Sequence, residues 1–498
     1  MKFNLVYGKS GSGKSKIIYE DIKNKIGTES IYLIVPEQSN LTAEQNLFKV
    51  TGENTLLNVE VLTLSRMASR VIMEVGGKLY TRLSKVGKSM LIYNILLKEK
   101  KNLKFLGKSD KNVDIVSNML TELKKHNIDV QSLLNTNFDD QYMRLKLEDI
   151  ETVYNAYEKQ INEKFIDEND SMNILKENLQ NTDMFKDSII YVDDFLGFTS
   201  QEFGVFEELL KVCSEMTVTS CIDDLEKITN VENDIFYFNK KFAIKLLQIA
   251  ENQNAEINKI NLTELYRFKN DELKFLEKNL SENSKEKYKK SSENVELFLA
   301  NNSYSEMEYV AKKIINLVKE NNVRYNEIGI VTQNIESYLE DAKAVFDKYE
   351  IPLFIDSKKE LNQNILIKYI IALLDIFAKN WSYDAMFDYL KVGLHEFNNE
   401  DIYELENYCK KWGIKGNKWY KRSFDYEPIN DLQSKLEEIR LEIVKPLLDF
   451  KNSVFENKTV LEITKKLYQF LIDNKINEIL DRKIKKYEIP EITDEYNT

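Results

Sequence analysis

The amino-acid sequence predicts an α/β protein whose core is a parallel, doubly wound β-sheet. Two observations support this prediction. Within residues 1–75, short apolar segments alternate with segments of helical periodicity. A glycine-rich turn directly follows the first apolar segment and leads into the first helical one. Strands that alternate with helices favour a parallel sheet, because each crossover helix returns the chain to the same end of the sheet.

The first part of the chain contains five expected elements before the pattern changes. In order, they are a strand at 2–7, a helix at 14–25, a strand at 31–36, a helix at about 40–49 and a strand at 58–66. From about 83 to 179 the sequence has the periodicity of long amphipathic helices. Strand character then returns at 188–195 and 216–221. We therefore expect a helical block inserted into an α/β domain.

A second α/β segment is expected further along the chain. It follows a Lys/Glu/Ser/Asn-rich stretch at 271–294, which we interpret as a solvated connection. Its strands are expected at 295–300, 328–332 and 351–356, with helices between them. Beyond Ile365 the periodicity is helical as far as Thr498.

The formal net charge of −12 argues against a protein that holds nucleic acid through a bulk positive potential. Neutralising phosphates requires Lys and Arg side chains. Any nucleic-acid site must therefore be a local groove, or a site shared with a partner.

The cysteines predict no metal site in this chain. Cys213, Cys221 and Cys409 are far apart and form no CxxC pair, so we interpret them as ordinary reduced thiols. No apolar run approaches the 18 residues of a membrane span. We expect a cytoplasmic chain without membrane contact.

A phosphate-binding loop is predicted at residues 8–15. The consensus GxxxxGK[ST] is matched in full by Gly8, Lys9, Ser10, Gly11, Ser12, Gly13, Lys14 and Ser15. Glycines allow consecutive backbone N–H groups to face phosphate oxygens, and the following helix adds the positive end of its dipole. In such loops the lysine reaches the β- and γ-phosphates and the Ser hydroxyl ligates Mg²⁺. We expect ATP and Mg²⁺ to bind here.

A second acidic motif completes the expected metal site. The apolar segment at 188–192 ends in Asp193 and Asp194. Asp193 is expected to hold Mg²⁺, and Asp194 stands where a hydrolytic enzyme places a Glu that orients the attacking water. Asp is one methylene shorter than Glu, so its carboxylate reaches less far toward the attacking water. A buried strand with an exposed acidic end is the alternative interpretation.

Six stretches of the chain, taken together, resemble the AddB family, also called RexB, the B subunit of the bacterial AddAB helicase–nuclease. They are GKSGSGKSK (8–16), IVPEQSNLTAEQNLF (34–48), VLTLSRMASRVIMEVGG (61–77), YVDDFLGFTSQEF (191–203), EMEYVAKKIINLVKENNVRYNEIGIV (306–331) and LENYCKKWGIKGNKW (405–419). The stretches are spread over most of the chain. They identify it as similar to the N-terminal part of that subunit.

The resemblance implies RecA-like P-loop domains of superfamily-1 helicase type with large helical insertions. The first RecA-like domain would comprise 1–80 and 180–285, with a helical insertion at 81–179. The second would begin at 286–380, with part of its insertion at 381–498. A C-terminal nuclease domain with a 4Fe–4S cluster is expected in the full-length subunit, beyond Thr498 and outside this chain.

The resemblance also implies a function. The subunit would act with an AddA-type helicase–nuclease in a heterodimer that processes double-stranded DNA ends for homologous recombination. It would scan single-stranded DNA for the regulatory sequence called Chi. We expect this chain to lack nuclease activity by itself.

Several positions depart from an active helicase motor. The adenine-reading Gln that precedes such loops has no room before Gly8, and Leu196-Gly197 stand where active relatives continue with a Gln-Asp-Thr sequence. Gln333 stands where an Arg that stabilises the transferring phosphate is expected. We therefore expect nucleotide binding without motor activity. A non-catalytic nucleotide-binding scaffold and an active superfamily-1 helicase remain the alternatives.

Two places are candidates for DNA contact. The resemblance makes Thr63 and Arg66 candidates for a single-stranded DNA site. The stretch 410–422 interleaves basic and aromatic residues, a pattern that suits backbone tracking and base stacking. Its candidates are Lys411, Trp412, Lys418 and Trp419. A helix-end loop anchored by tryptophans explains the same pattern equally well.

Overall fold

The computed structural model describes most of the chain. The described residues are 1–27, 29–52, 58–75, 81–106, 112–135, 140–161, 165–167, 170–226, 234–281, 286–355, 364–426, 431–455 and 459–486. The chain forms two compact units, Met1–Phe298 and Leu299–Thr498. Their boundary lies near the predicted start of a second domain at residue 286. The finer division into four parts stays a prediction.

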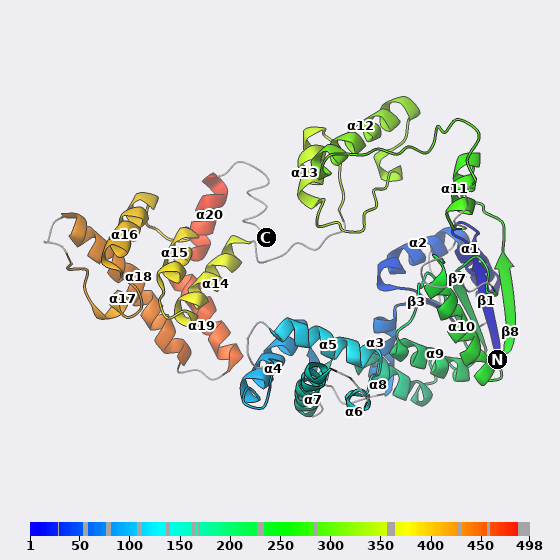
Figure 1. Cartoon of the computed structure of the whole chain (residues 1–498), viewed down its shortest axis with the longest axis horizontal. Coiled ribbons are helices and arrows are strands. Elements are labelled where there is room, and N and C mark those ends of the chain that lie inside the picture. Colours follow the sequence, from blue (N-terminus) through cyan, green and yellow to red (C-terminus); the bar gives the residue numbers. More distant parts are fainter. Residues whose placement is uncertain are drawn as a thin grey trace. The chain divides into compact units, whose positions relative to one another are not determined.

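The first unit is built on a six-stranded sheet (Figure 1). Its strands are β1 (Lys2–Gly8), β2 (Ile31–Ile34), β3 (Val59–Leu62), β6 (Ile189–Val192), β7 (Glu215–Cys221) and β8 (Glu256–Leu262). The order is β3-β2-β6-β7-β1-β8, and every neighbouring pair is parallel. The predicted α/β class with a parallel sheet is thus confirmed. Because all strands run the same way, their carboxyl ends meet at one edge.

Helices cover both faces of this sheet, as parallel sheets require. The covering helices are α1 (Lys14–Lys25), α2 (Asn40–Thr51), α3 (Leu64–Val75), α9 (Ser200–Val212) and α10 (Tyr237–Asn252). The same unit also contains η1 (Glu37–Ser39) and α11 (Asp271–Ser281). On one face, Ile18 and Ile22 of α1 and Leu47 of α2 pack with Leu33 of β2. On the other, α3, α9 and α10 contribute to a larger core that includes Leu5 of β1.

The predicted helical block lies between β3 and β6. It contains α4 (Lys85–Lys98), α5 (Val113–Lys125), α6 (Val130–Leu134), α7 (Gln141–Ile161), α8 (Ser171–Asn178) and η5 (Leu179–Asn181). Two short parallel strands, β4 (Thr81–Leu83) and β5 (Phe165–Asp167), pair with each other inside it. This small sheet was not predicted, since three-residue strands leave almost no alternating pattern.

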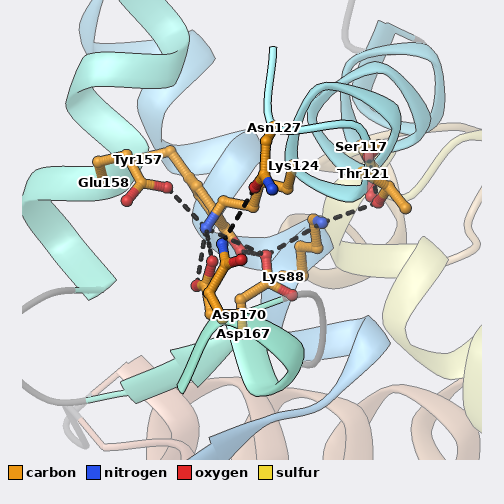
Figure 2. A network of polar contacts seen from close by, with 10 residues as sticks. Lys88, Ser117, Thr121, Lys124, Asn127, Tyr157, Glu158, Asp167 and Asp170 are labelled. Atoms are coloured by element: carbon orange, nitrogen blue, oxygen red, sulfur yellow. Dashed lines mark hydrogen bonds and ion pairs between the residues drawn. The ribbon is translucent and has the colours of Figure 1, made fainter. Parts of the chain in front are cut away.

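Buried ion pairs join the elements of the helical block (Figure 2). The ammonium of Lys124 on α5 lies 2.8 Å from Asp170, 2.6 Å from Glu158 on α7 and 3.8 Å from Asp167 of β5. Burial by itself would lower the pKa of Lys124, but the carboxylates of Asp170 and Glu158 outweigh it and raise the pKa. Lys124 therefore stays charged inside the protein and ties three elements together.

A second buried lysine extends the same network to α4 (Figure 2). Lys88 lies 3.2 Å from the carboxylate of Asp167 and donates a 2.9 Å hydrogen bond to Thr121 of α5. The hydroxyl of Tyr157 on α7 donates to the same carboxylate, at 2.8 Å. Because an unpaired buried charge is costly, these contacts fix the inner face of α4 against α5, α7 and β5.

In the described residues of the second unit, all regular secondary structure is helical. It contains α12 (Ser303–Asn321), η6 (Tyr325–Glu327), α13 (Leu339–Lys348), α14 (Ile365–Ala378), α15 (Tyr383–Lys391), α16 (Asn399–Trp412), α17 (Lys418–Lys421), α18 (Asp431–Phe455), α19 (Val460–Asp473) and α20 (Ile476–Lys486). A small core joins α12 and α13, and a larger core joins helices α14 to α20. The predicted helical character beyond Ile365 is confirmed for the described residues between 365 and 486.

The strands predicted for the second α/β segment are wrong for the residues that the structure describes. The segments 295–300, 328–332 and 351–355 are extended or irregular and belong to no sheet, and residue 356 lies outside the described part. A strand exists only where a neighbour completes its hydrogen bonds. These apolar segments lack such a neighbour among the described residues.

Two further predictions need correction. The strand expected at 58–66 ends at Leu62, because Leu64 already begins helix α3. The connection expected at 271–294 begins with helix α11, which extends to Ser281.

Candidate functional site: the phosphate loop and the carboxyl edge of the sheet

The predicted phosphate loop lies between β1 and α1, at the carboxyl edge of the sheet. Gly11 and Gly13 have φ angles of 84° and 88°, a left-handed conformation that favours glycine. Gly13 directly precedes the first turn of α1, whose N–H groups have no partner within the helix. The loop therefore has the backbone conformation and helix end that an anion site of this kind needs.

Lys14 is folded back over the loop. Its ammonium donates hydrogen bonds to the carbonyl oxygens of Gly8 (2.8 Å) and Lys9 (2.9 Å). Burial lowers the pKa of Lys14 from its ordinary value, with neighbouring charges opposing one another. The side chain of Ser12 is buried in the same loop, and its Oγ has no hydrogen-bond partner among the described residues. The loop is thus compact, with a cation held at its centre.

Asp193 lies at the end of β6, facing the loop. Its Oδ1 accepts a 2.5 Å hydrogen bond from Thr219 of β7, and its carboxylate also accepts one from Ser15. Burial raises the pKa of Asp193, while the two hydroxyl donors oppose that shift. A hydroxyl and a carboxylate in direct contact are oxygen ligands of the type that Mg²⁺ takes. The predicted pair, Ser15 and Asp193, therefore fits a metal site of this chemistry.

Asp194, the second acidic residue, has a different hydrogen-bond partner. It adopts a positive φ of 67°, unusual for a residue with a side chain. Its Oδ2 accepts a 2.5 Å hydrogen bond from Ser39, at the start of α2. The carboxylate predicted to orient water is thus engaged by a hydroxyl from the segment that follows β2.

One cation at this site was missed by sequence reasoning. Arg267 follows β8 and lies over the loop, where its Nη1 donates a 3.1 Å hydrogen bond to Oγ of Ser10. The backbone N–H groups of Tyr266 and Arg267 both donate to the carbonyl oxygen of Gly11, at 2.9 and 3.4 Å. The sequence predicts a phosphate-stabilising arginine at the position that Gln333 occupies, whereas the structure places the guanidinium of Arg267 against the loop. The signal in the sequence is the basic Tyr-Arg-Phe-Lys stretch that follows the strand.

Together these residues line one cavity of 360 Å³. Lys14 and Arg267 give it positive charge, and Asp193 and Asp194 give it acidic oxygens. Charged groups of both signs around a glycine-rich loop suit an anionic ligand that arrives with a cation. The side chains come from separate strand ends that the parallel sheet brings to one edge.

The first pair of DNA candidates lies beside the edge strand β3. Thr63 is buried, and its Oγ1 accepts a 3.3 Å hydrogen bond from the backbone N–H of Arg66 at the start of α3. Arg66 is half exposed and lies 3.6 Å from Glu44 of α2. It lines a groove of 640 Å³ between α2 and α3 that also contains Arg70. The structure thus gives Thr63 a capping role and leaves Arg66 on the surface.

The second group of candidates lies at the end of α16 and on α17. Trp419 is fully buried, its ring packs beside Phe387 and Phe424, and its carbonyl accepts a 2.7 Å hydrogen bond from Arg440. In this conformation it cannot stack on a base, which favours the interpretation as a core anchor.

The other residues of that stretch are nearer the surface. Trp412 stacks on Tyr426, with ring centroids 5.6 Å apart. The ammonium of Lys418 donates to the carbonyl oxygen of Gly413 at 3.0 Å and so closes the end of α16. Lys411 is exposed and lies over the Trp412 ring. DNA contact by Lys411, Trp412 and Lys418 stays a prediction.

The fold and the loop define a class: an α/β protein with a parallel sheet and a complete GxxxxGK[ST] consensus at its carboxyl edge. A family profile described as the N-terminal part of AddB matches residues 5–277. The chain belongs to this family, whose relatives are named as the B subunit of an ATP-dependent helicase/deoxyribonuclease.

Three relatives of that name show how far the similarity extends. The chain is 35% identical over 512 residues to the protein of Clostridium acetobutylicum and 35% identical over 517 residues to that of Clostridium tetani. It is 34% identical over 524 residues to that of Clostridium botulinum strain Langeland. These matches cover 98%, 98% and 100% of the chain but 44%, 45% and 46% of the relatives. The chain therefore spans less than half the length of the curated relatives it matches.

No helix in the described part of the chain is long and apolar enough to cross a membrane.

Proposed function

We propose that the first unit is a RecA-like domain that binds ATP with Mg²⁺ at residues 8–15. Lys14 would leave the carbonyl oxygens of the loop for the β- and γ-phosphates, because a phosphate offers it a stronger, charge-assisted partner. Ser15 and Asp193 would hold the metal ion. Arg267 would supply a second positive charge to the phosphates.

We also propose the role of the whole protein. It would act with an AddA-type partner as a heterodimer on double-stranded DNA ends and single-stranded DNA, in the repair of breaks by homologous recombination. Reading of the Chi sequence, a nuclease domain and its 4Fe–4S cluster belong to this proposal for the full-length protein. The names of the relatives support an assembly, since a subunit has partners.

The observation that carries the nucleotide proposal is the convergence of Lys14, Ser15, Asp193 and Arg267 on one cavity. Lys14→Ala should abolish ATP binding, because it removes the central charge of the loop. Isothermal titration and the ATP-induced rise in melting temperature measure the effect. Lys16→Ala is the matched control, since Lys16 lines the same cavity but has an exposed side chain that forms an ion pair with Glu20. Equal melting shifts in wild type and Lys14→Ala would contradict the proposal.

We propose further that ATP turnover is slow. Hydrolysis requires a carboxylate that orients the attacking water, and Asp194 is a short residue whose Oδ2 is taken by Ser39. Such a defect acts on the transition state, so it lowers turnover more than affinity.

An ATP-driven motor is the second candidate, and Arg267 favours it. An arginine on the transferring phosphate is worth about 10³–10⁵ in rate in other systems. Single-stranded-DNA-stimulated ATPase should therefore be measured on the chain alone and with an AddA-type partner carrying an inactive phosphate loop. Turnover of several per second that is lost in Lys14→Ala would establish the motor, whereas turnover near background would support the slow site.

A further inference from the structure

Helix α4 carries apolar side chains on two opposite faces. On the inner face, Ile92, Ile95 and Leu96 are buried in the core of the helical block. On the outer face are Val86, Met90, Tyr93 and Leu97, which are 69%, 50%, 41% and 45% exposed. At 100° per residue, their spacing of four, three and four places them within about 60° of one another. We call these four residues the α4 stripe.

The stripe is not needed for the core of its own domain. The inner face already packs in one cluster with Val153 and Tyr157 of α7. Lys88, on the same inner face, is tied to Asp167 and Thr121 (Figure 2). Helix α4 is thus held in place from one side, and its outer stripe is presented on a preformed helix.

Positive charge surrounds both ends of the stripe. Lys85 precedes it, and Lys98, Lys100 and Lys101 follow it. None of these four forms an ion pair with another residue that the structure describes, although the chain as a whole has a net charge of −12. The carboxylate of Glu99, which lies among them, accepts a hydrogen bond from Asn102. The surface around the stripe is therefore complementary to carboxylates.

We propose that the α4 stripe docks an amphipathic helix of another polypeptide, whose apolar seam is bordered by acidic residues. A four-three-four spacing is the seam of a helix pair packed side by side, with knobs from one helix in the holes of the other. Lysines at both ends set the charge of the partner and its register. The proposal lies beyond the nucleotide site, since no residue of the stripe lines that cavity.

An anionic membrane surface is the less favoured occupant of this surface. A helix that lies in a membrane interface needs a wide apolar face, whereas the stripe is narrow and flanked by Ser89 and Asn94.

Met90 provides a built-in reporter for the test. Oxidation of exposed methionines by dilute peroxide follows their access to solvent. Met73 on α3, which is 81% exposed, is the matched control. Met216 is fully buried in β7 and gives the oxidation rate of a methionine without access to solvent. The probe is a peptide of four heptads with Leu at positions a and d and Glu at e and g; a Lys version of the same peptide is its control. We expect the Glu peptide to slow oxidation of Met90 at least fivefold and to leave Met73 unchanged.

Substitutions in the α4 stripe test whether the peptide binds there. Tyr93→Glu with Leu97→Glu should weaken binding of the labelled Glu peptide about tenfold or more, measured by fluorescence anisotropy. Leu280→Glu on α11, another exposed leucine, should have no effect. Lys98→Glu with Lys101→Glu should reverse the preference, so that the Lys peptide binds more tightly than the Glu peptide.

Several results would overturn the proposal. Slow oxidation of Met90 in the free chain would mean that the chain itself covers the stripe. Self-association that disappears in Tyr93→Glu/Leu97→Glu would make a second copy the occupant. Binding to phosphatidylserine vesicles without binding to the peptide would point to a membrane, and equal binding of both peptides would remove the charge argument. The ATP-induced rise in melting temperature is measured on the same variants. Because no residue of the stripe lines the nucleotide cavity, this rise tests the nucleotide proposal separately from the docking proposal.

Discussion

Arg267 reaches the phosphate loop from a strand that lies beside β1, and the loop holds it by backbone as well as side-chain contacts. The N–H groups of Tyr266 and Arg267 donate to Gly11, while the guanidinium donates to Ser10. The residue is therefore positioned before any ligand arrives, and a preorganised cation loses little entropy on binding a phosphate.

Arg267→Ala should weaken ATP binding about tenfold or more and affect ADP less, because the change removes a charge-assisted hydrogen bond to a phosphate-rich ligand. Arg267→Lys should restore part of the affinity. Isothermal titration with both nucleotides measures the difference, and Arg70→Ala, which removes an arginine paired with Glu60, is the control. An ATP affinity that stays at the wild-type value would show that Arg267 does not touch the ligand.

The raised pKa of Asp193 predicts that binding of Mg²⁺ at this site depends on pH. Burial raises the pKa of Asp193 above its ordinary value of 3.8, so at a given acidic pH more of it is protonated than of an exposed carboxyl. Protons compete with Mg²⁺ for the carboxylate. The gain in ATP affinity that Mg²⁺ provides should therefore fall as the pH decreases, and it should fall further in the wild type than in Asp193→Asn, in which only the phosphates of ATP titrate.

Titrations of ATP with and without Mg²⁺ across this acidic range measure that gain. Asp193→Asn should show a small gain at every pH, since the amide does not titrate. Wild-type and Asp193→Asn profiles of the same shape would show that Asp193 does not titrate against the metal.

At the scale of elements, the buried ion pairs of Lys124 are expected to stabilise the helical block, and a substitution can test this. Lys124→Met should lower the free energy of unfolding by about 3–5 kcal/mol, because it leaves the carboxylates of Asp170 and Glu158 without their cation. The midpoint of urea unfolding, followed by circular dichroism, measures the loss. Lys125→Met is the control, since its side chain is exposed on the same helix. A loss of less than about 1 kcal/mol would mean that water reaches and solvates the network.

The elements that could be predicted from the sequence are those whose signal is local. Helix α1 was predicted with its observed bounds, Lys14–Lys25, because a strand, a glycine turn and a helical period follow one another directly. Strand β6 could be predicted because it is a continuous apolar run, as expected of a fully buried strand. Strand β8 was missed because it lies at the edge of the sheet and reads EINKINL, with polar residues between its isoleucines.

For the site too, the residues that could be predicted are those with a local signal in the sequence. Gly8 to Ser15 and Asp193 could be predicted because a motif or a strand end marks each of them. The place of Arg267 depends on β8 lying next to β1, a pairing between segments about 250 residues apart that leaves no local pattern. The burial of Trp419 depends on packing against α18, which is also a non-local fact.

At the scale of the whole chain, the two units differ in how their apolar extended segments are used. In the first unit the apolar segments β1, β2 and β6 are paired strands of the parallel sheet. In the second, the segment 328–332 has no strand partner among the described residues, and Val331 is 96% exposed. Side chains of this type are usually buried in a sheet.

The difference predicts unequal hydrogen exchange. The backbone amides of 329–332 should exchange with solvent within seconds at neutral pH, whereas those of β6 should be protected for hours or longer. Peptide-level exchange followed by mass spectrometry measures both in one experiment. Helix α12, which lies in the same unit, is the internal control for a folded second unit. Protection of 329–332 equal to that of β6 would mean that these amides have hydrogen-bond partners.

The contact between Gly11 and Arg267 has a consequence for how this sequence can change over generations. A Cβ atom at position 11 would lie 2.6 Å from the Cβ of Arg267, and the φ of 84° disfavours a side chain there in any case. Substitution at position 11 is therefore opposed twice, once by the backbone and once by the arginine above it. A lineage that replaced Arg267 with glycine would remove the steric obstacle and keep the conformational one. Glycine should thus be retained at position 11 whichever residue stands at position 267, because the positive φ remains when the steric obstacle is removed.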